Sequence, residues 1–134
     1  PNVLRGGAGD DRLFGRTGAG RLAGATASDV LAGGADGAVD RFIFASALGP
    51  DNVDRILQFR PADDLVLLSD AVFTALGAPG ALAVNAWHEG ASATSAAHRI
   101  VYHAGSGRLW YDADGSGAGE AVLSARFDAG TALD

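Results

Sequence analysis

Aspartates that stand among glycines near the N-terminus are the side chains of this sequence best suited to chemistry. Asp11 and Asp40 follow glycine-rich stretches, and Asp29 stands five residues after Gly24, as Asp11 does after Gly6. Glycine accepts the positive φ that tight turns need, and such turns aim peptide carbonyl oxygens toward one point. Carboxylate and carbonyl oxygens together make the shell that hard cations such as Ca²⁺ prefer. The pattern therefore predicts a metal site, with calcium ions as the ligand.

The residues from Gly6 to Phe14 fit the nonapeptide G-G-x-G-x-D-x-U-x, in which U is a large apolar residue. Asp11 occupies the acidic position and Leu13 the apolar one. The glycine turn would hold the ion, and the apolar side chain would point from a short strand into a core between two sheets. The metal-binding residues predicted in this region are Gly6, Gly7, Gly9, Asp11, Gly24, Asp29 and Asp40.

The apolar position of this unit recurs with a period of nine residues. The spacing holds without a slip from Leu4 through Leu13 and Leu22 to Leu31. A fixed short period is the signature of stacked repeats, in which each unit buries its apolar face against its neighbours. We therefore predict an all-β fold in which residues 1–44 form a short parallel β-roll.

In such a roll, successive turns lie on alternate flanks, so an ion sits between one turn and the next but one. Asp11 and Asp29 share a flank and supply paired carboxylates. On the other flank, Asp40 enters the series only after an insertion of two residues. The preceding position on that flank is Gly20, which offers no carboxylate.

Other departures from the template leave two interpretations open. Ala25 and Ala27 stand where the template has glycine, and alanine resists a positive φ. The first interpretation is a roll that binds calcium through its aspartates. The second is a degenerate roll held together by its leucine ladder alone.

A second oxygen-rich motif lies in the C-terminal half. It has oxygen side chains at alternate places, followed by a glycine, as in the front half of an EF-hand calcium loop. The twelfth place of that loop is Leu123 instead of the usual bidentate glutamate, and Glu120 is a substitute. A polar hairpin turn without metal is the alternative, since Asp and Gly favour turns in any case. The predicted ligands are Asp112, Asp114 and Ser116.

Beyond residue 44 the period is lost and ordinary strand and turn signals follow. Alternating or continuous apolar runs bounded by turn residues predict strands. We expect residues 45–134 to form an antiparallel β cap that is continuous with the roll. A short helix is expected to begin at Ser69, which is a good N-terminal cap, and to end at Leu76. The strands expected in this region are 53–59, 65–68, 99–103, 108–112 and 121–127.

The composition excludes several classes of function. A chain of 134 residues is about one domain. Its net charge is −6 and its ten basic residues are all arginine, which argues against nucleic acid as a partner. The absence of cysteine excludes disulfides, thiolate zinc sites and cysteine nucleophiles. No stretch approaches the ~20 apolar residues of a membrane span.

No motif in the sequence indicates catalysis. The three histidines, His88, His98 and His103, do not have the H-E-x-x-H spacing of a zinc enzyme. No G-x-S-x-G nucleophile elbow and no phosphate-binding glycine loop is present. We therefore expect a protein that is not an enzyme.

Several runs make the chain similar to the C-terminal part of RTX (repeats-in-toxin) proteins, the hemolysin-type calcium-binding family of bacteria. The resemblance covers essentially the whole chain and is carried by Asp29–Gly34, Phe42–Leu48, Asn52–Ile56 and Leu109–Gly119. It implies an extracellular or cell-surface location, export by type I secretion machinery, and folding triggered by external calcium.

The sequence therefore predicts a calcium-binding module of a secreted bacterial protein. One alternative is a structural or adhesive subunit of a surface layer or filament, with repeats that are largely free of metal and with self-association between copies. The other alternative is the secretion domain of a larger secreted hydrolase.

Overall fold

The computed structural model describes residues 2–34, 37–45, 52–60, 62–69, 72–73, 86–90, 92–115, 121–128 and 131. Within these residues the regular elements are strands, which confirms the prediction of an all-β fold. The strands are β1 (Asn2–Gly7), β2 (Arg12–Phe14), β3 (Gly20–Ala25), β4 (Val30–Ala32), β5 (Arg41–Phe44), β6 (Asp54–Leu57), β7 (Leu65–Leu68), β8 (Trp87–Glu89), β9 (Ile100–His103), β10 (Arg108–Tyr111) and β11 (Val122–Phe127).

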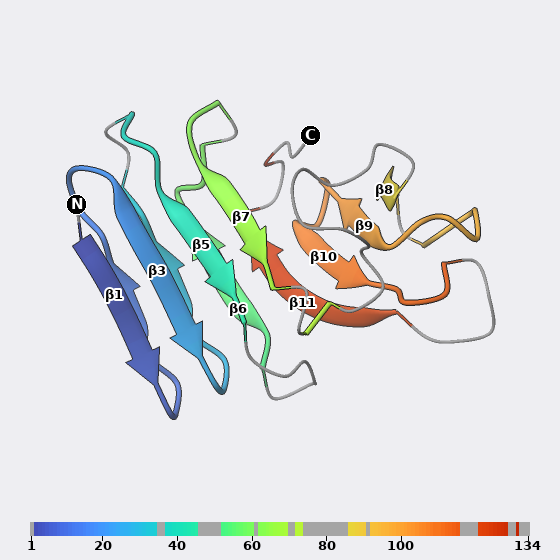
Figure 1. Cartoon of the computed structure of the whole chain (residues 1–134). Coiled ribbons are helices and arrows are strands. Elements are labelled where there is room, and N and C mark those ends of the chain that lie inside the picture. The colour runs from blue at the N-terminus through green and yellow to red at the C-terminus, as the bar shows by residue number, and fades with distance from the viewer. Residues whose placement is uncertain are drawn as a thin grey trace.

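Strands that follow one another in the chain from β1 to β7 belong alternately to two sheets. The four-stranded sheet has the order β1-β3-β5-β7, and the seven-stranded sheet has the order β2-β4-β6-β11-β10-β9-β8. Every pairing among β1 to β7 is parallel. Figure 1 shows β1, β3, β5 and β7 side by side, with β11, β10 and β9 on the far side of β6. We refer to β1–β7 as the parallel coil.

The nine-residue period explains the register of the parallel coil. Residues two repeats apart are direct partners, so Leu4 pairs with Leu22 and Leu13 pairs with Leu31. Leu22 and Leu31 are fully buried between the two sheets. Because side chains alternate between the two faces of a strand, this register keeps one large apolar residue of each strand in the core.

Parallel pairing does not end at residue 44. β6 pairs with β4 and β7 pairs with β5, so the coil continues to Leu68 after the glycine repeat has disappeared. Ile56 lies beside Leu31 and is fully buried, and Val66 lies beside Phe42. An apolar residue at the right place therefore extends the coil even where the turn before it has changed.

The C-terminal part differs from the expected antiparallel cap because its strands are of mixed direction. β9, β10 and β11 pair antiparallel, as expected, but β11 pairs parallel with β6 and β8 pairs parallel with β9. Through β11 the C-terminal strands join the sheet of the coil. Phe127 of β11 lies beside Ile56 of β6 and continues the core across the junction.

Aromatic side chains fill the space beneath the C-terminal strands. Phe59 packs edge-on against Phe127 with ring centres 5.1 Å apart, and Phe73 does the same against Tyr111 at 5.0 Å. Of the helix expected from residue 69 to 76, only 69, 72 and 73 are described, where the N–H of Phe73 donates to the Ser69 carbonyl. Within the described part of the chain, no helix is long and apolar enough to cross a membrane.

The two alanines that replace template glycines do adopt a left-handed backbone. Ala25 and Ala27 both have φ of 77°, whereas their counterparts one coil earlier are Gly7, with φ of 96°, and Gly9, with φ of 88°. A left-handed backbone costs an L-residue roughly 1–2 kcal/mol. The two alanines therefore keep the conformation of the glycine turn, and their backbone is strained.

Returning glycine to these positions is expected to stabilise the protein. The double variant Ala25→Gly/Ala27→Gly should raise the free energy of unfolding by about 1 kcal/mol, because relief of strain exceeds the entropy that glycine adds to the unfolded chain. Urea unfolding measures the change. As a control, Ala23→Gly in the same strand, where φ is not positive, should destabilise. A double variant that is less stable than the wild type would contradict the assignment of strain.

Candidate metal centre

Aspartates at the entrance to successive strands form a ladder of hydrogen bonds on one flank of the coil. Oδ1 of Asp29 accepts from the backbone N–H of Asp11 at 2.8 Å, and Oδ1 of Asp54 accepts from the N–H of Asp29 at 3.0 Å. Asp11 and Asp29 directly precede β2 and β4 of the seven-stranded sheet, and Asp54 is the first residue of β6. We call Asp11, Asp29 and Asp54 the first ladder. The carboxylates of Asp29 and Asp54 thus satisfy the backbone donor one coil earlier, which parallel strands leave unpaired at their ends.

The opposite flank carries a second ladder with the same geometry. Oδ1 of Asp40 accepts from the N–H of Gly20 at 2.7 Å, and Oδ1 of Asp64 accepts from the N–H of Asp40 at 3.0 Å. Asp40 and Asp64 precede β5 and β7 of the four-stranded sheet. Gly20 therefore takes part through its backbone, although it brings no carboxylate.

In Asp11 and Asp29 of the first ladder, the second carboxylate oxygen is the group that points to a ligand. Oδ2 of Asp11 and Oδ2 of Asp29 are buried and accept no hydrogen bond. Asp29 as a residue is 1% exposed. A buried carboxylate oxygen without a partner is costly, and an ion is one of the explanations for such an atom. Both aspartates that the sequence predicts as paired ligands therefore have a buried oxygen atom that accepts no hydrogen bond.

Two template glycines make room for these oxygens. A methyl group at Gly6 would lie 2.6 Å from Oδ2 of Asp11 and 2.8 Å from the carbonyl oxygen of Gly24. A methyl group at Gly24 would overlap Oδ2 of Asp29. The carboxylate of each aspartate thus folds back over the glycine that opens its own repeat. At Gly6 this brings a carboxylate oxygen and a carbonyl oxygen of the next coil on that flank close together, which is the kind of donor set that suits Ca²⁺.

The other predicted glycines shape the turn without touching its ligands. Gly7 and Gly9 have positive φ, and a methyl group at either would meet nothing within 4 Å. They therefore serve the backbone conformation. The side chain of Asp10 also bridges coils on this flank, since its Oδ1 accepts from the N–H of Ser28 at 3.0 Å.

The electrostatics of the first ladder are unfavourable in the absence of a cation. Burial raises the pKa of Asp29, and the negative charges of Asp11 and Asp10 raise it further, against the hydrogen bond from the Asp11 N–H. Burial also raises the pKa of Asp54 to about 6. Like charges at close range disfavour ionisation. A cation between these coils would remove that penalty.

This burial predicts how stability depends on pH when no metal is present. A carboxyl whose pKa is higher in the folded state binds more protons there than in the unfolded chain between pH 3.8 and about 6. Its stabilising effect is complete below pH 3.8 and is lost as the pH rises through about 6. In EGTA, the Asp54 carboxyl should therefore raise the free energy of unfolding by on the order of 2–3 kcal/mol between pH 7 and pH 4.

Urea unfolding in EGTA across this pH range tests the prediction. Asp54→Asn is the matched variant, because an amide oxygen can still accept from the Asp29 N–H while it does not titrate. It should show a flatter pH profile than the wild type. The profile should keep a remaining slope of the same sign, because burial also raises the pKa of Asp29 and of Asp112. Parallel profiles for the two proteins would show that Asp54 does not titrate in this range.

The second predicted motif lies at the end of β10, in a different part of the sheet from the ladders. Asp112 is buried, its N–H donates to the Arg99 carbonyl at 2.7 Å, and its Oδ1 accepts from the N–H of Asp114 at 3.4 Å. Burial raises the pKa of Asp112, as does the side chain of Asp114. Gly115 has a positive φ, as the turn requires. Ser116 and Glu120 lie outside the described residues, so this motif stays a prediction.

Sequence reasoning missed two members of the ladders, Asp54 and Asp64. The signal that would have found them is the triplet Asp-x-U, in which the aspartate enters a strand and U faces the core. It occurs as Asp54-Arg55-Ile56 and as Asp64-Leu65-Val66. Both triplets lack the preceding glycine-rich run, so the full nonapeptide does not match them.

Within the described residues, no three side chains of His, Cys, Asp or Glu are grouped to hold a metal ion. A site at the first ladder would therefore take two carboxylates and complete its shell with peptide carbonyls, as the glycine-rich template does. Comparisons with protein-family models, with curated proteins and with solved structures found no match to the chain.

Proposed function

We propose that this chain is a non-enzymatic calcium-binding module of the RTX type, from a bacterial protein that is exported by type I secretion and folds on meeting calcium outside the cell. The observation that carries the proposal is the pair of buried oxygens, Oδ2 of Asp11 and Oδ2 of Asp29, that accept no hydrogen bond. Asp11 and Asp29 would hold the ion together with carbonyl oxygens from the turns of Gly6 and Gly24. The ion would supply positive charge and fixed oxygen coordination between two coils.

Charge repulsion gives the module a reason to respond to calcium. The carboxylates of Asp10, Asp11 and Asp29 lie close enough to raise the pKa of Asp29. At low calcium this repulsion and the entropy of a glycine-rich chain favour the unfolded state. Binding to the folded state alone adds stability as RT ln(1 + [L]/Kd). Extracellular calcium modules have dissociation constants of roughly 10⁻⁴ to 10⁻³ M. Such a site would be empty at the low calcium concentration of the cytosol and would fill outside the cell.

Calorimetric titration with calcium tests the proposal directly. The wild type should bind with a Kd of roughly 10⁻⁴ to 10⁻³ M. Asp11→Asn should weaken binding at least about tenfold, because it removes one of two charged ligands. The control is Asp63→Asn, which makes the same change of charge at a residue paired with Arg60 in a surface salt bridge of 3.1 Å. Equal effects of the two variants, or no binding by the wild type, would overturn the proposal.

A specific observation also favours the structural alternative. β1 and β2 stand at the edges of the two described sheets, and they carry Val3 and Phe14 with 63% and 51% of their surface exposed. Exposed apolar edge strands can pair with another copy. If the chain is a subunit of a surface layer or filament, sedimentation should show assembly in EGTA as well as in calcium, and Val3→Lys should abolish it. A monomer at all concentrations excludes this alternative.

A further inference from the structure

Arginines line up across the outer face of the seven-stranded sheet. In the triplet Asp-x-U, the middle residue faces away from the core, and in β2 and β6 it is Arg12 and Arg55. The register of the sheet places Arg126 of β11 directly beside Arg55, and Arg108 of β10 directly beside Arg126. The complete row across six neighbouring strands is Arg12, Val30, Arg55, Arg126, Arg108 and His103.

We call these six residues the arginine row. Its four arginines are exposed, and none of them makes a salt bridge within the described residues. Neighbouring strands are about 4.8 Å apart, so the row is about 24 Å long and presents its charges along a line. Like charges that face each other on adjacent strands repel. The protein as a whole has a net charge of −6, yet these positive charges are gathered along one line. Binding of an anionic ligand would explain this arrangement.

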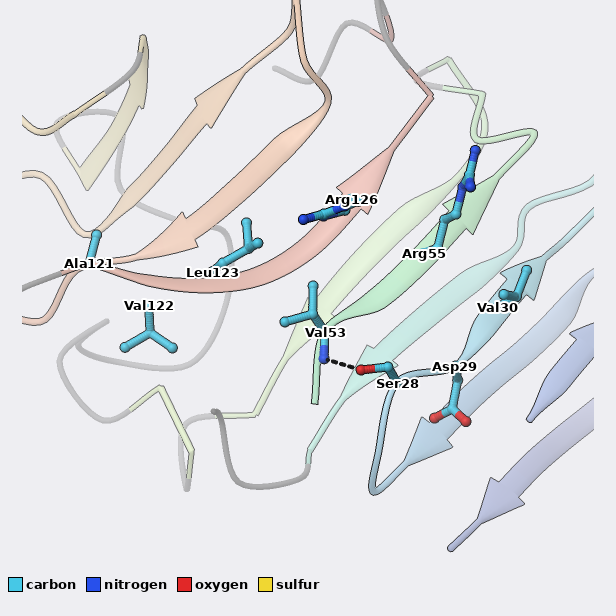
Figure 2. Close-up of a pocket in the computed structure, with 9 residues that line it drawn as sticks. All are labelled: Ser28, Asp29, Val30, Val53, Arg55, Ala121, Val122, Leu123 and Arg126. Carbon is cyan, nitrogen blue, oxygen red and sulfur yellow. Dashed lines mark hydrogen bonds between the residues drawn. The ribbon is translucent and has the colours of Figure 1, made fainter. Parts of the chain in front are cut away.

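An open pocket of about 720 Å³ lies along the middle of the row. Arg55 and Arg126 line it together with apolar side chains of Val30, Val53 and Val122. Figure 2 shows the two arginines on the neighbouring strands β6 and β11, and the Asp29 carboxylate turned away from both. Binding sites commonly combine an apolar surface with a few placed polar groups. The pocket thus offers apolar contact and guanidinium groups side by side.

We infer that the arginine row binds a linear polysaccharide that carries carboxylate groups. The guanidinium fork matches a planar carboxylate in two parallel hydrogen bonds. A polyuronate presents carboxylates at regular intervals along an extended chain, and the apolar faces of its sugar rings fit against valine side chains. No aromatic side chain is among the described residues that line the pocket, and single-stranded nucleic acid needs such a platform for its bases. This inference does not depend on calcium binding at the aspartate ladders.

The four-stranded sheet supplies a matched control. There Arg21 of β3 and Arg41 of β5 are also direct partners, but their row ends on the apolar residues Val3 and Leu65. The variants Arg55→Gln/Arg126→Gln and Arg21→Gln/Arg41→Gln remove equal charge from opposite faces of the protein. A general attraction between a polyanion and positive charge would respond equally to both.

Calorimetric titration with a short oligogalacturonate, at one fixed concentration of free calcium in cell and syringe, tests the inference. Wild type and Arg21→Gln/Arg41→Gln should bind alike, and Arg55→Gln/Arg126→Gln should bind at least about tenfold more weakly. A neutral oligomaltoside of equal length should not bind. Thermal unfolding checks the fold, and the variant in the row should melt at or above the wild-type temperature because it removes a like-charge pair.

Three results would overturn the inference. The first is a wild type that does not bind oligogalacturonate. The second is an equal loss of affinity in the two double variants, which would indicate diffuse attraction. The third is tighter binding of single-stranded oligothymidylate than of oligogalacturonate, which would assign the row to nucleic acid.

Discussion

Replacing Asp29 with asparagine is expected to reverse the order of stability between variant and wild type when calcium is added. Asparagine keeps an oxygen that can accept from the N–H of Asp11, so the ladder is preserved. It removes a buried charge whose pKa is raised by burial and by the charges of Asp11 and Asp10. In EGTA at neutral pH, Asp29→Asn should therefore be at least as stable as the wild type.

Calcium should stabilise the wild type far more than Asp29→Asn. At a concentration about one hundred times the dissociation constant, a ligand of the folded state adds about 3 kcal/mol. Asp29→Asn should lose most of that gain because it lacks one of the two carboxylates. Urea unfolding of both proteins, in EGTA and in calcium, measures the four free energies of unfolding. Equal stabilisation of the two proteins by calcium would place the ion elsewhere.

Alanine at the same position separates the two roles of the aspartate. Asp29→Ala removes the acceptor for the Asp11 N–H as well as the charge. A buried backbone donor left without a partner costs about 1–3 kcal/mol. In EGTA, Asp29→Ala should therefore be less stable than Asp29→Asn by about that amount. If the two variants are equally stable, the hydrogen bond between Asp29 and the Asp11 N–H contributes nothing to the free energy of unfolding.

The substitution Gly24→Ala is expected to lower the free energy of unfolding by about 3 kcal/mol, because added atoms in a packed site force side chains and backbone to shift. Gly24 is buried, and its new methyl group would overlap Oδ2 of Asp29. The carboxylate would have to swing away, which breaks its hydrogen bond with Asp11 and displaces a predicted calcium ligand. The variant should consequently lose its response to calcium as well as its stability.

Gly7→Ala is the control for this prediction. Gly7 lies at a positive φ, but a methyl group there would meet nothing within 4 Å. Its cost should be that of the left-handed backbone alone, roughly 1–2 kcal/mol. It should also retain the calcium response, which thermal melts in EGTA and in calcium compare. A loss of response in both variants would mean that any disturbance of the turn abolishes binding, and that the contact with Asp29 has no special part.

The parallel coil was predictable because its information is local and periodic. A leucine every nine residues places one apolar residue in each strand, and the pairing of Leu4 with Leu22 follows from that spacing. The positive φ at Ala25 and Ala27 was not predicted, because alanine resists this conformation, yet both residues adopt it as the template glycines do. The extension of the coil through β6 and β7 was missed because the glycines are gone there, although the Asp-x-U triplets remain.

The pairing of β11 with β6 could not be predicted in the same way. About seventy residues separate the strands, and neither carries a repeat that would specify its partner. Which strands meet at such a distance depends on how the whole core packs. The strands themselves lie close to the expected ranges, since β7, β9, β10 and β11 all begin within a residue of the predicted start.

The chemistry of the aspartates was predicted only in part. The sequence presented Asp11 and Asp29 as metal ligands, and their free Oδ2 atoms agree with that hypothesis. It did not reveal that Oδ1 of Asp29 and of Asp40 bonds to the backbone of the preceding coil on the same flank. The same aspartate residues fit two roles, since a carboxylate can accept a backbone hydrogen bond and can also coordinate a metal ion. The sequence pattern alone does not separate these roles. A roll that has lost its metal would still need Asp29 and Asp40 as acceptors of these backbone hydrogen bonds.

The most direct test of the proposed calcium-binding function is far-UV circular dichroism with a thermal melt, in excess EGTA and again in millimolar calcium. Calcium-coupled folding predicts a smaller folded fraction in EGTA, with a weaker β signal and a lower melting temperature, and an increase in both on addition of calcium. Magnesium at the same concentration should not replace calcium, since it prefers to keep its own waters. An identical β-rich spectrum and melting temperature in both buffers would contradict the account. The aspartate ladders would then be a purely structural device of the parallel coil.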